Sequence, residues 1–225
     1  MGYVIRPRSE GVLALLVAVL ALSAHSDVRL HAQWAIGPSR SSPIALTSDN
    51  TKLVNVNSDT NTVTVFDATT SPPTKLAEIP VGVDPTSVAV HPTVALAFVA
   101  NAFSGTVSVI DLNTYTVTRT VAVGAEPMAV ALSPNGTRLY VANSSSNTLS
   151  VVNTTTYAVI ATVDLSSVGT APRAIAVTND ADIDDTDETI FVAMFFGQLR
   201  PGKTSVDEGQ DDQREGHVVA ISSNT

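Results

Sequence analysis

Pro85-Thr-Ser-Val-Ala-Val90 is a segment that the chain repeats twice more, as Pro127-Met-Ala-Val-Ala-Leu132 and as Pro172-Arg-Ala-Ile-Ala-Val177. The three copies start 42 and 45 residues apart. A similar segment that returns at an interval of this size is the sequence signature of repeat folds such as solenoids and propellers. The fold is therefore decided by the repeat.

Three further segments recur in phase with the first and complete the repeat. One consists of Phe98-Val-Ala-Asn101, Tyr140-Val-Ala-Asn143 and Phe191-Val-Ala-Met194. Another consists of Thr62-Val-Thr-Val-Phe-Asp67, Thr106-Val-Ser-Val-Ile-Asp111 and Thr148-Leu-Ser-Val-Val-Asn153. The last ends in Val81-Gly82 and Val123-Gly124. Each repeat thus holds four short strands, named A to D in chain order, between Asn, Ser, Asp, Gly and Pro turns.

Four strands in a repeat of about 40 to 45 residues are typical of a β-propeller blade. The sequence predicts an all-β fold, a β-propeller of four-stranded antiparallel blades. About four blades are present, at approximately residues 43–81, 85–123, 127–164 and 172–222. Blade four departs from the repeat through insertions at residues 179–188 and 195–216.

The Phe98–Asn101 and Tyr140–Asn143 strands, the Gly-x-x-Pro segment before strand A and the Thr106–Asp111 strand resemble the YVTN family of β-propeller repeats. The resemblance covers the chain from Trp34 to about Ser222. That group is similar to surface-layer proteins, lactonase-like propellers and the propeller portions of some periplasmic redox proteins. Because such scaffolds host unrelated functions, the resemblance implies the fold and leaves the activity open.

Blade four ends without a strand D, whereas Trp34-Ala-Ile-Gly37 aligns with Val121-Ala-Val-Gly124 and predicts an orphan strand D before blade one. The two defects are complementary, so one interpretation is a four-bladed ring in which one terminus completes the blade of the other. The other is a truncated larger propeller, which we favour because fixed-period repeats carry no stop signal. An open arc leaves apolar flanks, which predicts self-association through uncovered blade edges.

Residues 1–26 have the features of a secretory signal peptide, because Arg6 and Arg8 precede an apolar stretch from Val12 to Leu22 that small residues follow. About 11 apolar residues are too few to cross a bilayer core, which needs roughly 20. Residues 27–33 form a short linker, and the repeats occupy residues 34–225. We therefore expect a protein exported to the periplasm or the cell surface, without a membrane span in the mature chain.

Composition excludes several kinds of site. The chain has no cysteine, which rules out a disulfide framework, a thiolate metal site and covalent haem attachment through C-x-x-C-H. The net charge is −9, and 11 of the 21 acidic residues lie between Asp180 and Glu215. No basic patch is available to hold phosphates, so we expect no nucleic-acid partner.

The insertion at residues 195–216 is the main candidate for recognition, because function concentrates in loops that break a regular scaffold. It replaces a four-residue turn of blade three and is expected to project over the axial mouth of the ring. Phe195 and Phe196 are predicted as apolar anchors and Arg200 as an anion-binding group. The candidate binding residues are Phe195, Phe196, Arg200, Lys203, Asp211, Asp212, Arg214, Asp84 and Glu126. The alternative is a solvated insertion without a specific role.

The insertion at residues 179–188 is a candidate cation site. Asp180, Asp182 and Asp184 alternate, so a loop can turn their carboxylates towards one hard cation such as Ca²⁺. The spacing departs from an EF-hand, since Asp185 replaces the turn glycine and Phe191 stands where the bidentate Glu belongs. A solvated acidic turn is the other interpretation.

The leading functional interpretation is a non-enzymatic binding scaffold that presents the blade-four insertions to a protein or cell-envelope partner. The first alternative is a lactonase-like hydrolase with acids such as Asp84 and Glu126 around the axial funnel. The second is a redox-associated periplasmic propeller domain. No nucleophile motif, phosphate loop or zinc motif is present, so the sequence predicts no catalytic residue and no certain cofactor.

Overall fold

A computed structural model describes residues 39–40, 42–182, 184–199 and 214–224. The predicted signal peptide, the linker and the Trp34–Gly37 strand lie outside the described residues. In the described part of the chain, no helix is long and apolar enough to cross a membrane.

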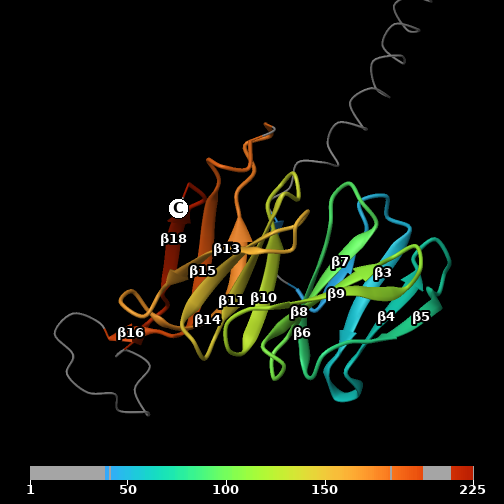
Figure 1. Cartoon of the computed structure of the whole chain (residues 1–225), viewed down its shortest axis with the longest axis horizontal. Coiled ribbons are helices and arrows are strands. Elements are labelled where there is room, and N and C mark those ends of the chain that lie inside the picture. The colour runs from blue at the N-terminus through green and yellow to red at the C-terminus, as the bar shows by residue number, and fades with distance from the viewer. Residues whose placement is uncertain (1–38, 41, 183, 200–213, 225) are drawn as a thin grey trace, which may run out of the picture. The chain divides into compact units, whose positions relative to one another are not determined.

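The first three blades are antiparallel sheets of four consecutive strands (Figure 1). Blade one contains β2 (Ile44–Leu46), β3 (Lys52–Asn57), β4 (Thr62–Asp67) and β5 (Thr74–Pro80), with a single 3-10 turn, η1 (Ser58–Thr60), between β3 and β4. Blade two contains β6 (Pro85–Val90), β7 (Leu96–Asn101), β8 (Thr106–Asp111) and β9 (Thr116–Ala122). Blade three contains β10 (Pro127–Leu132), β11 (Arg138–Asn143), β12 (Thr148–Asn153) and β13 (Val159–Asp164). The predicted all-β propeller fold is confirmed.

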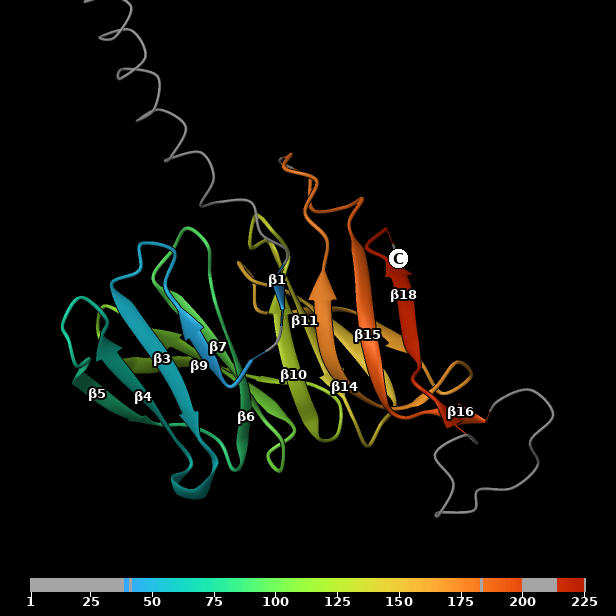
Figure 2. The same cartoon turned by 180° about the vertical axis from the view of Figure 1, so that it is seen from behind.

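Blade four takes its fourth strand from the other end of the chain. Its order is β1 (Ser39–Arg40), β14 (Thr170–Val177), β15 (Thr189–Phe196) and β18 (Val218–Ser222). β1 pairs with β14 and also contacts β10 (Figure 2). This strand therefore lies beside strand A, whereas the repeat alignment predicts that the segment just before it lies beside strand C. Within the described residues, β18 forms the outer edge of the sheet.

The apolar core lies between neighbouring blades. Side chains of a strand alternate between the two faces of its sheet, and these sheets are apolar on both. Three core clusters join blade one to two, two to three and three to four. Members drawn from the two sides of each junction are Val65 and Val88, Phe98 and Leu139, and Tyr140 and Ile190. Among the described residues, no such cluster joins blade four to blade one.

A buried asparagine at the end of strand B fixes the position of the neighbouring strand. The Asn101 side-chain amide donates hydrogen bonds to Thr106 Oγ1 at 3.2 Å and Ser108 Oγ at 3.0 Å, both on strand C. A Cβ atom on Gly82 would lie only 2.6 Å from Asn101 Cγ. Glycine is therefore required where strand D leads into the next blade, because any side chain would collide with this asparagine.

We expect Gly82→Ala to lower the free energy of unfolding by about 1–3 kcal/mol, as overpacking of a close contact does. Urea denaturation measures the change. Gly216→Ala is the matched control, since a Cβ atom there would have no neighbour within 4 Å, and it should stay within about 0.5 kcal/mol of the parent chain. Equal stability of the two variants would contradict this account of the asparagine contact.

Candidate functional site

The loop between β14 and β15 is anchored to blade three by Asp185, whose side chain is only 5% exposed. Its carboxylate accepts hydrogen bonds from Ser133 Oγ at 2.7 Å, the Asn135 backbone N–H at 2.9 Å, the Thr137 backbone N–H at 3.2 Å and Thr137 Oγ1 at 2.5 Å. All three residues belong to the A-to-B turn of blade three. Asp185 therefore clamps one blade to the turn of the preceding blade.

Opposing effects set the pKa of Asp185. Burial raises the pKa, but the hydrogen bonds from Thr137, Asn135 and Ser133 together outweigh it and hold the pKa below its ordinary value. His91 lies against the same turn, next to Gly136. Burial lowers the pKa of His91, and this effect outweighs the hydrogen bond with the Gly136 backbone and the negative charge of Asp185, which both raise it. His91 Nδ1 accepts hydrogen bonds from the backbone N–H groups of Thr93 and Val94, both at 3.2 Å. These two residues are thus structural.

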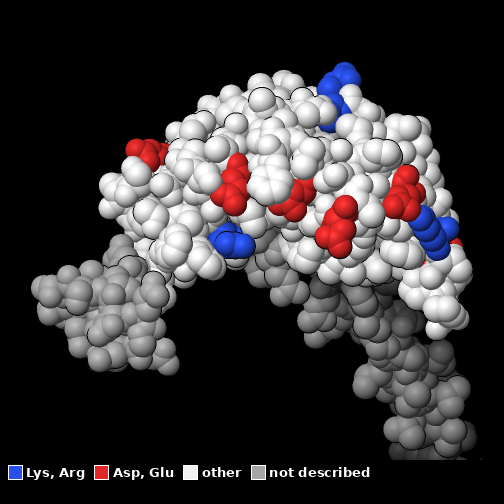
Figure 3. Space-filling model, turned by 90° about the horizontal axis from the view of Figure 1, so that it is seen from below, with Lys and Arg blue, Asp and Glu red and all other residues white. Residues whose placement is uncertain are grey.

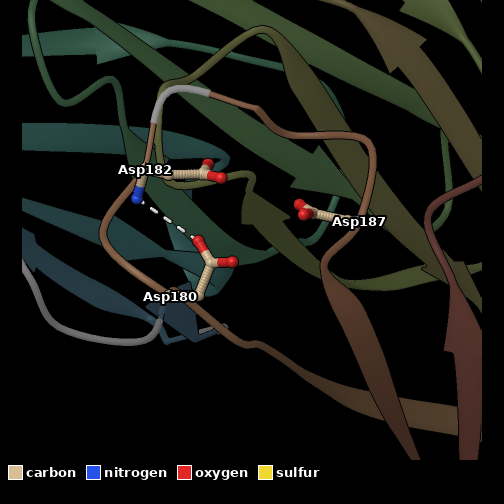
Figure 4. Close-up of side chains that lie close together, drawn as sticks. All are labelled: Asp180, Asp182 and Asp187. Atoms are coloured by element: carbon tan, nitrogen blue, oxygen red, sulfur yellow. Dashed lines mark hydrogen bonds between the residues drawn. The ribbon is translucent and has the colours of Figure 1, made fainter.

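Three exposed carboxylates come together in the same loop, at Asp180, Asp182 and Asp187 (Figure 4). One ligand oxygen from each lies within 4.8 Å of the others. Partial desolvation raises the pKa of Asp187, and the negative charges of Asp180 and Asp182 raise it further. The sequence analysis named Asp184 in place of Asp187. The Asp184 carboxylate instead accepts a hydrogen bond from the Thr186 backbone N–H at 2.8 Å.

The aromatic pair Phe195 and Phe196 belongs to the end of β15 and not to the loop that follows. β15 is two residues longer than β11. In blades two and three, strand B ends in a buried asparagine, and the two rings of blade four lie beyond the equivalent position. Phe195 is 57% exposed and Phe196 is 53% exposed. Their rings meet edge to face with centroids 4.9 Å apart. The Arg173 guanidinium lies 4.6 Å from the Phe195 ring centroid, a cation–π contact.

The rest of the predicted recognition loop is only partly described. β16 (Gln198–Leu199) pairs antiparallel with β17 (Arg214–Glu215), so a short ladder joins the two ends of the insertion. Leu199 lies opposite Arg214 in this ladder. The predicted binding residues Arg200, Lys203, Asp211 and Asp212, and the side chain of Arg214, lie outside the described residues.

Asp84 and Glu126 occupy equivalent positions in the D-to-A turns before blades two and three. Both have a left-handed backbone, with φ of 57° and 56°. The Asp84 N–H donates a hydrogen bond to Asn61 Oδ1 at 2.8 Å, and the Glu126 carboxylate accepts one from the Ser145 hydroxyl. Blade four has Ala171 at the same position with φ of 55°. The turn therefore does not require a carboxylate.

On the face seen from below, the Asp and Glu side chains lie scattered over the described surface and do not form a single patch (Figure 3). The acids proposed for an axial funnel thus belong to the D-to-A turns of successive blades. The Glu126 carboxylate is bonded to Ser145, whereas Asp84 is bonded through its backbone N–H. The acidic trio and Asp185 lie in an A-to-B loop, which belongs to the opposite side of a blade. The structure consequently divides the candidate residues between the two ends of blade four and the turns of blades two and three.

A pocket between blades one and two is lined by residues that include Lys52, His91, Asp49 and Leu112. The Lys52 ammonium donates a hydrogen bond to the Leu112 carbonyl oxygen at 2.7 Å. It also lies 5.4 Å from the centroid of the Tyr115 ring. This cation therefore holds two blades together, and the pocket is a groove at a blade junction.

Comparison with known proteins supports a β-propeller family. Residues 72–167 match the family model described as YNCE-like beta-propeller. Hydrazine synthase from Kuenenia stuttgartiensis is similar in structure, with a TM-score of 0.57, 21% sequence identity, and coverage of 80% of this chain and 62% of that one. This level of identity shows the shared fold alone.

Two further structures have TM-scores of 0.52. Dihydro-heme d1 dehydrogenase NirN in complex with DHE is 18% identical, with coverage of 76% of this chain and 35% of that one. A functionally unknown protein from Desulfotomaculum acetoxidans is 16% identical, with coverage of 69% and 51%. The chain thus spans less than two thirds of the length of these structures. A search of curated proteins finds no significant match.

We expect Asp185→Asn to lower the free energy of unfolding at pH 7 by about 1–3 kcal/mol, because the amide removes a charged acceptor from several buried donors. Asp184→Asn is the matched control on the neighbouring exposed position and should have little effect. Denaturant unfolding measures both variants.

The same pair of variants has a defined pH dependence. Because the pKa of Asp185 is lowered in the folded state, its stabilisation is present above the unfolded-state pKa of about 3.9 and is lost as pH falls through the folded-state value. The difference in free energy of unfolding between the parent chain and Asp185→Asn should therefore become smaller below about pH 4. A gap that stays constant from pH 7 to pH 3 would exclude the clamp.

Proposed function

We propose that the chain is an exported β-propeller that serves as an interaction scaffold in the periplasm or at the cell surface, with a protein or cell-envelope partner. The observation that supports this is the concentration of irregular features in blade four. There the repeat gives way to an extended β15, a ladder at the base of an insertion, and an acidic loop anchored by Asp185. Regular blades supply the rigid support that a binding surface needs.

The exposed aromatic pair is the best contact surface in the described part of blade four. Phe195 and Phe196 stand beyond the last core position of β15, and Arg173 stacks on the first of them. Aromatic residues and arginine are enriched among the side chains that contribute most to protein interfaces. Phe196 lies opposite Thr170 at the start of β14. The pair is therefore held by the sheet and loses little conformational freedom on binding.

Export is proposed from the amino-terminal sequence. A positive n-region, an apolar stretch and small residues stand in the order that a signal peptidase substrate requires. The periplasm and the cell surface are oxidising environments. A chain without cysteine has no thiol that could be oxidised there.

A second candidate, a propeller portion of a larger redox protein, is favoured by the names of two structural neighbours. One is a hydrazine synthase and the other a dihydro-heme d1 dehydrogenase. A lactonase-like hydrolase has less support, because Asp84 and Glu126 lie in the D-to-A turns of different blades and the equivalent position in blade four is Ala171. Haem absorption after incubation with haem, and a lactone hydrolysis assay, distinguish the two alternatives from a scaffold.

The scaffold proposal is tested by retention of envelope proteins on the immobilised chain. With a total envelope-protein fraction as the probe, we expect Phe196→Ser to reduce specifically retained proteins at least about tenfold, the effect of removing one interface hot spot. Phe103→Ser is the matched control, because Phe103 is a 79% exposed phenylalanine just beyond β7 of blade two. Equal retention by both variants would count against recognition at blade four.

We also propose that the Asp180, Asp182 and Asp187 carboxylates bind Ca²⁺, which prefers oxygen ligands of this kind. Desolvation and then the negative charges of Asp180 and Asp182 raise the pKa of Asp187, and a bound cation offsets these charges. At a Ca²⁺ concentration about 100 times its dissociation constant, the free energy of unfolding should rise by about 2.7 kcal/mol. Asp187→Asn should abolish the rise and Asp184→Asn should preserve it. Calorimetry that shows neither heat nor stabilisation would remove the proposal.

A further inference from the structure

The A-to-B turn of blade one carries a carboxylate of its own. Asp49 Oδ1 accepts hydrogen bonds from Thr47 Oγ1 at 2.6 Å, the Thr51 backbone N–H at 3.0 Å and Thr51 Oγ1 at 2.9 Å. The next residue, Asn50, has a left-handed backbone with φ of 59°. One carboxylate oxygen therefore closes this turn, and it accepts from the residues two places before and two places after it.

The A-to-B turn of blade three has the same frame, six residues from Ser133 to Arg138 that align with residues 47–52. In both turns the first backbone N–H donates to the last carbonyl oxygen at 2.9 Å. In both, the first hydroxyl accepts from the last backbone N–H at 3.0 Å. The left-handed position is Gly136, with φ of 78°. At the position of the carboxylate, however, this turn has the uncharged Asn135.

Asp185 of blade four supplies the carboxylate that the turn of blade three lacks. Its Oδ2 atom alone accepts from Ser133 Oγ, the Thr137 backbone N–H and Thr137 Oγ1. These three donors are the counterparts of the three that Asp49 takes in blade one. Its Oδ1 atom accepts from the Asn135 backbone N–H. The same turn is thus closed from within in blade one and from the next blade in blade three.

The one Asn-Gly pair of the sequence lies in this turn, at Asn135 and Gly136. Packing requires the glycine, because a Cβ atom there would lie only 2.5 Å from His91 Nε2. Asparagine is a chemically labile residue. It is most labile before glycine, which has no Cβ atom to obstruct the approach of its backbone nitrogen to the side-chain amide. Asn135 is only half-buried, so water has access to its side chain.

We propose that Asn135 is a site of deamidation and that the product displaces Asp185 from the turn. The Gly136 backbone nitrogen attacks Asn135 Cγ, the Cγ–Nδ2 bond breaks, and ammonia leaves with the proton of the attacking nitrogen. Water then opens the cyclic imide. Cleavage at Cγ gives aspartate, and cleavage at the other carbonyl gives isoaspartate. Water is the only co-reactant, and nothing is oxidised or reduced.

The aspartate product stands where blade one has Asp49, so its carboxylate takes the three donors within its own turn. Asp185 is only 5% exposed, and a second carboxylate beside it is repelled strongly at such a buried position. The reaction also removes the amide donor that bonds to the Asp182 carbonyl oxygen at 3.4 Å. The loop at residues 179–188 consequently loses its hold on blade three.

The closed turn slows this reaction. The Gly136 N–H donates to the Ser133 carbonyl oxygen at 2.9 Å, so the nitrogen attacks only while this bond is open. Asp185 keeps the turn closed, because it accepts from residues on both sides of Gly136. The clamp therefore protects Asn135, and loss of the clamp exposes it.

The first test follows the reaction in the full chain, kept at neutral pH and sampled over weeks. Peptide mass mapping detects the conversion of amide to acid at each asparagine. Asn135 should convert first, and at least about tenfold faster in Asp185→Asn, which corresponds to about 1.4 kcal/mol of turn closure. Asp184→Asn leaves the clamp intact and should convert at the rate of the parent chain.

The second test uses Asn135→Asp as the product and amide hydrogen exchange as the measurement. The backbone N–H of residue 135 should exchange at least about tenfold faster than in the parent chain, because Asp185 no longer accepts from it. The Thr137 N–H should stay protected by the new carboxylate. Asn135→Ser retains the clamp and should protect both groups. Circular dichroism verifies that each variant folds.

The third test separates repulsion from simple loss of a bond. Asn135→Asp combined with Asp185→Asn should be more stable to urea than Asn135→Asp alone, since one of two neighbouring charges is removed.

Three outcomes overturn the inference. One is an Asn135 that stays unconverted in both the parent chain and Asp185→Asn. Another is unchanged protection of the residue 135 N–H in Asn135→Asp. The last is a combined variant that is no more stable than Asn135→Asp. None of them concerns retention of partners through Phe196, so this inference and the scaffold proposal fail separately.

Discussion

Apolar packing between adjacent blades is the constraint on which the rest of the structure depends. A sheet of four short strands with two oily faces cannot shield itself from water, and each face is buried only by the next blade. Tyr140 is 1% exposed because Ile190 and its neighbours lie against it. The glycine before each strand A, the buried asparagine of strand B and the left-handed turn residues all serve to bring successive sheets within contact distance.

The repeated part of the fold could be predicted because several copies constrain one another. In strand C, Val alternates with Thr or Ser, and in strand A, Ala alternates with larger residues. Only one pairing register of the strands fits these patterns in all copies of the repeat. A short strand with no copy gives no such information. β1 consists of Ser39 and Arg40, carries no periodic pattern, and owes its position to the free inner edge of β14.

The candidate site was less predictable for the same reason. Residues 179–188 have no equivalent in the other blades, so spacing alone indicates Asp180, Asp182 and Asp184 as ligands. The loop path instead brings Asp187 to the first two and buries Asp185 under the turn of blade three. The only feature of the sequence that pointed to Asp187 as a ligand was the excess of carboxylates in residues 179–188. No local signal marks Asp185, because its donors lie about 50 residues earlier in the chain.

The pairing of β1 with β14 has a consequence for the order of folding. Ser39 and Val177 are opposite each other although they are separated by roughly 140 residues, and closing so long a loop costs more entropy than forming any hairpin within a blade. Hairpins form in microseconds, and non-local pairings follow more slowly. During synthesis from the amino terminus, this short strand has no pairing partner until β14 has emerged, so its pairing is expected to follow the hairpins of blades one to three.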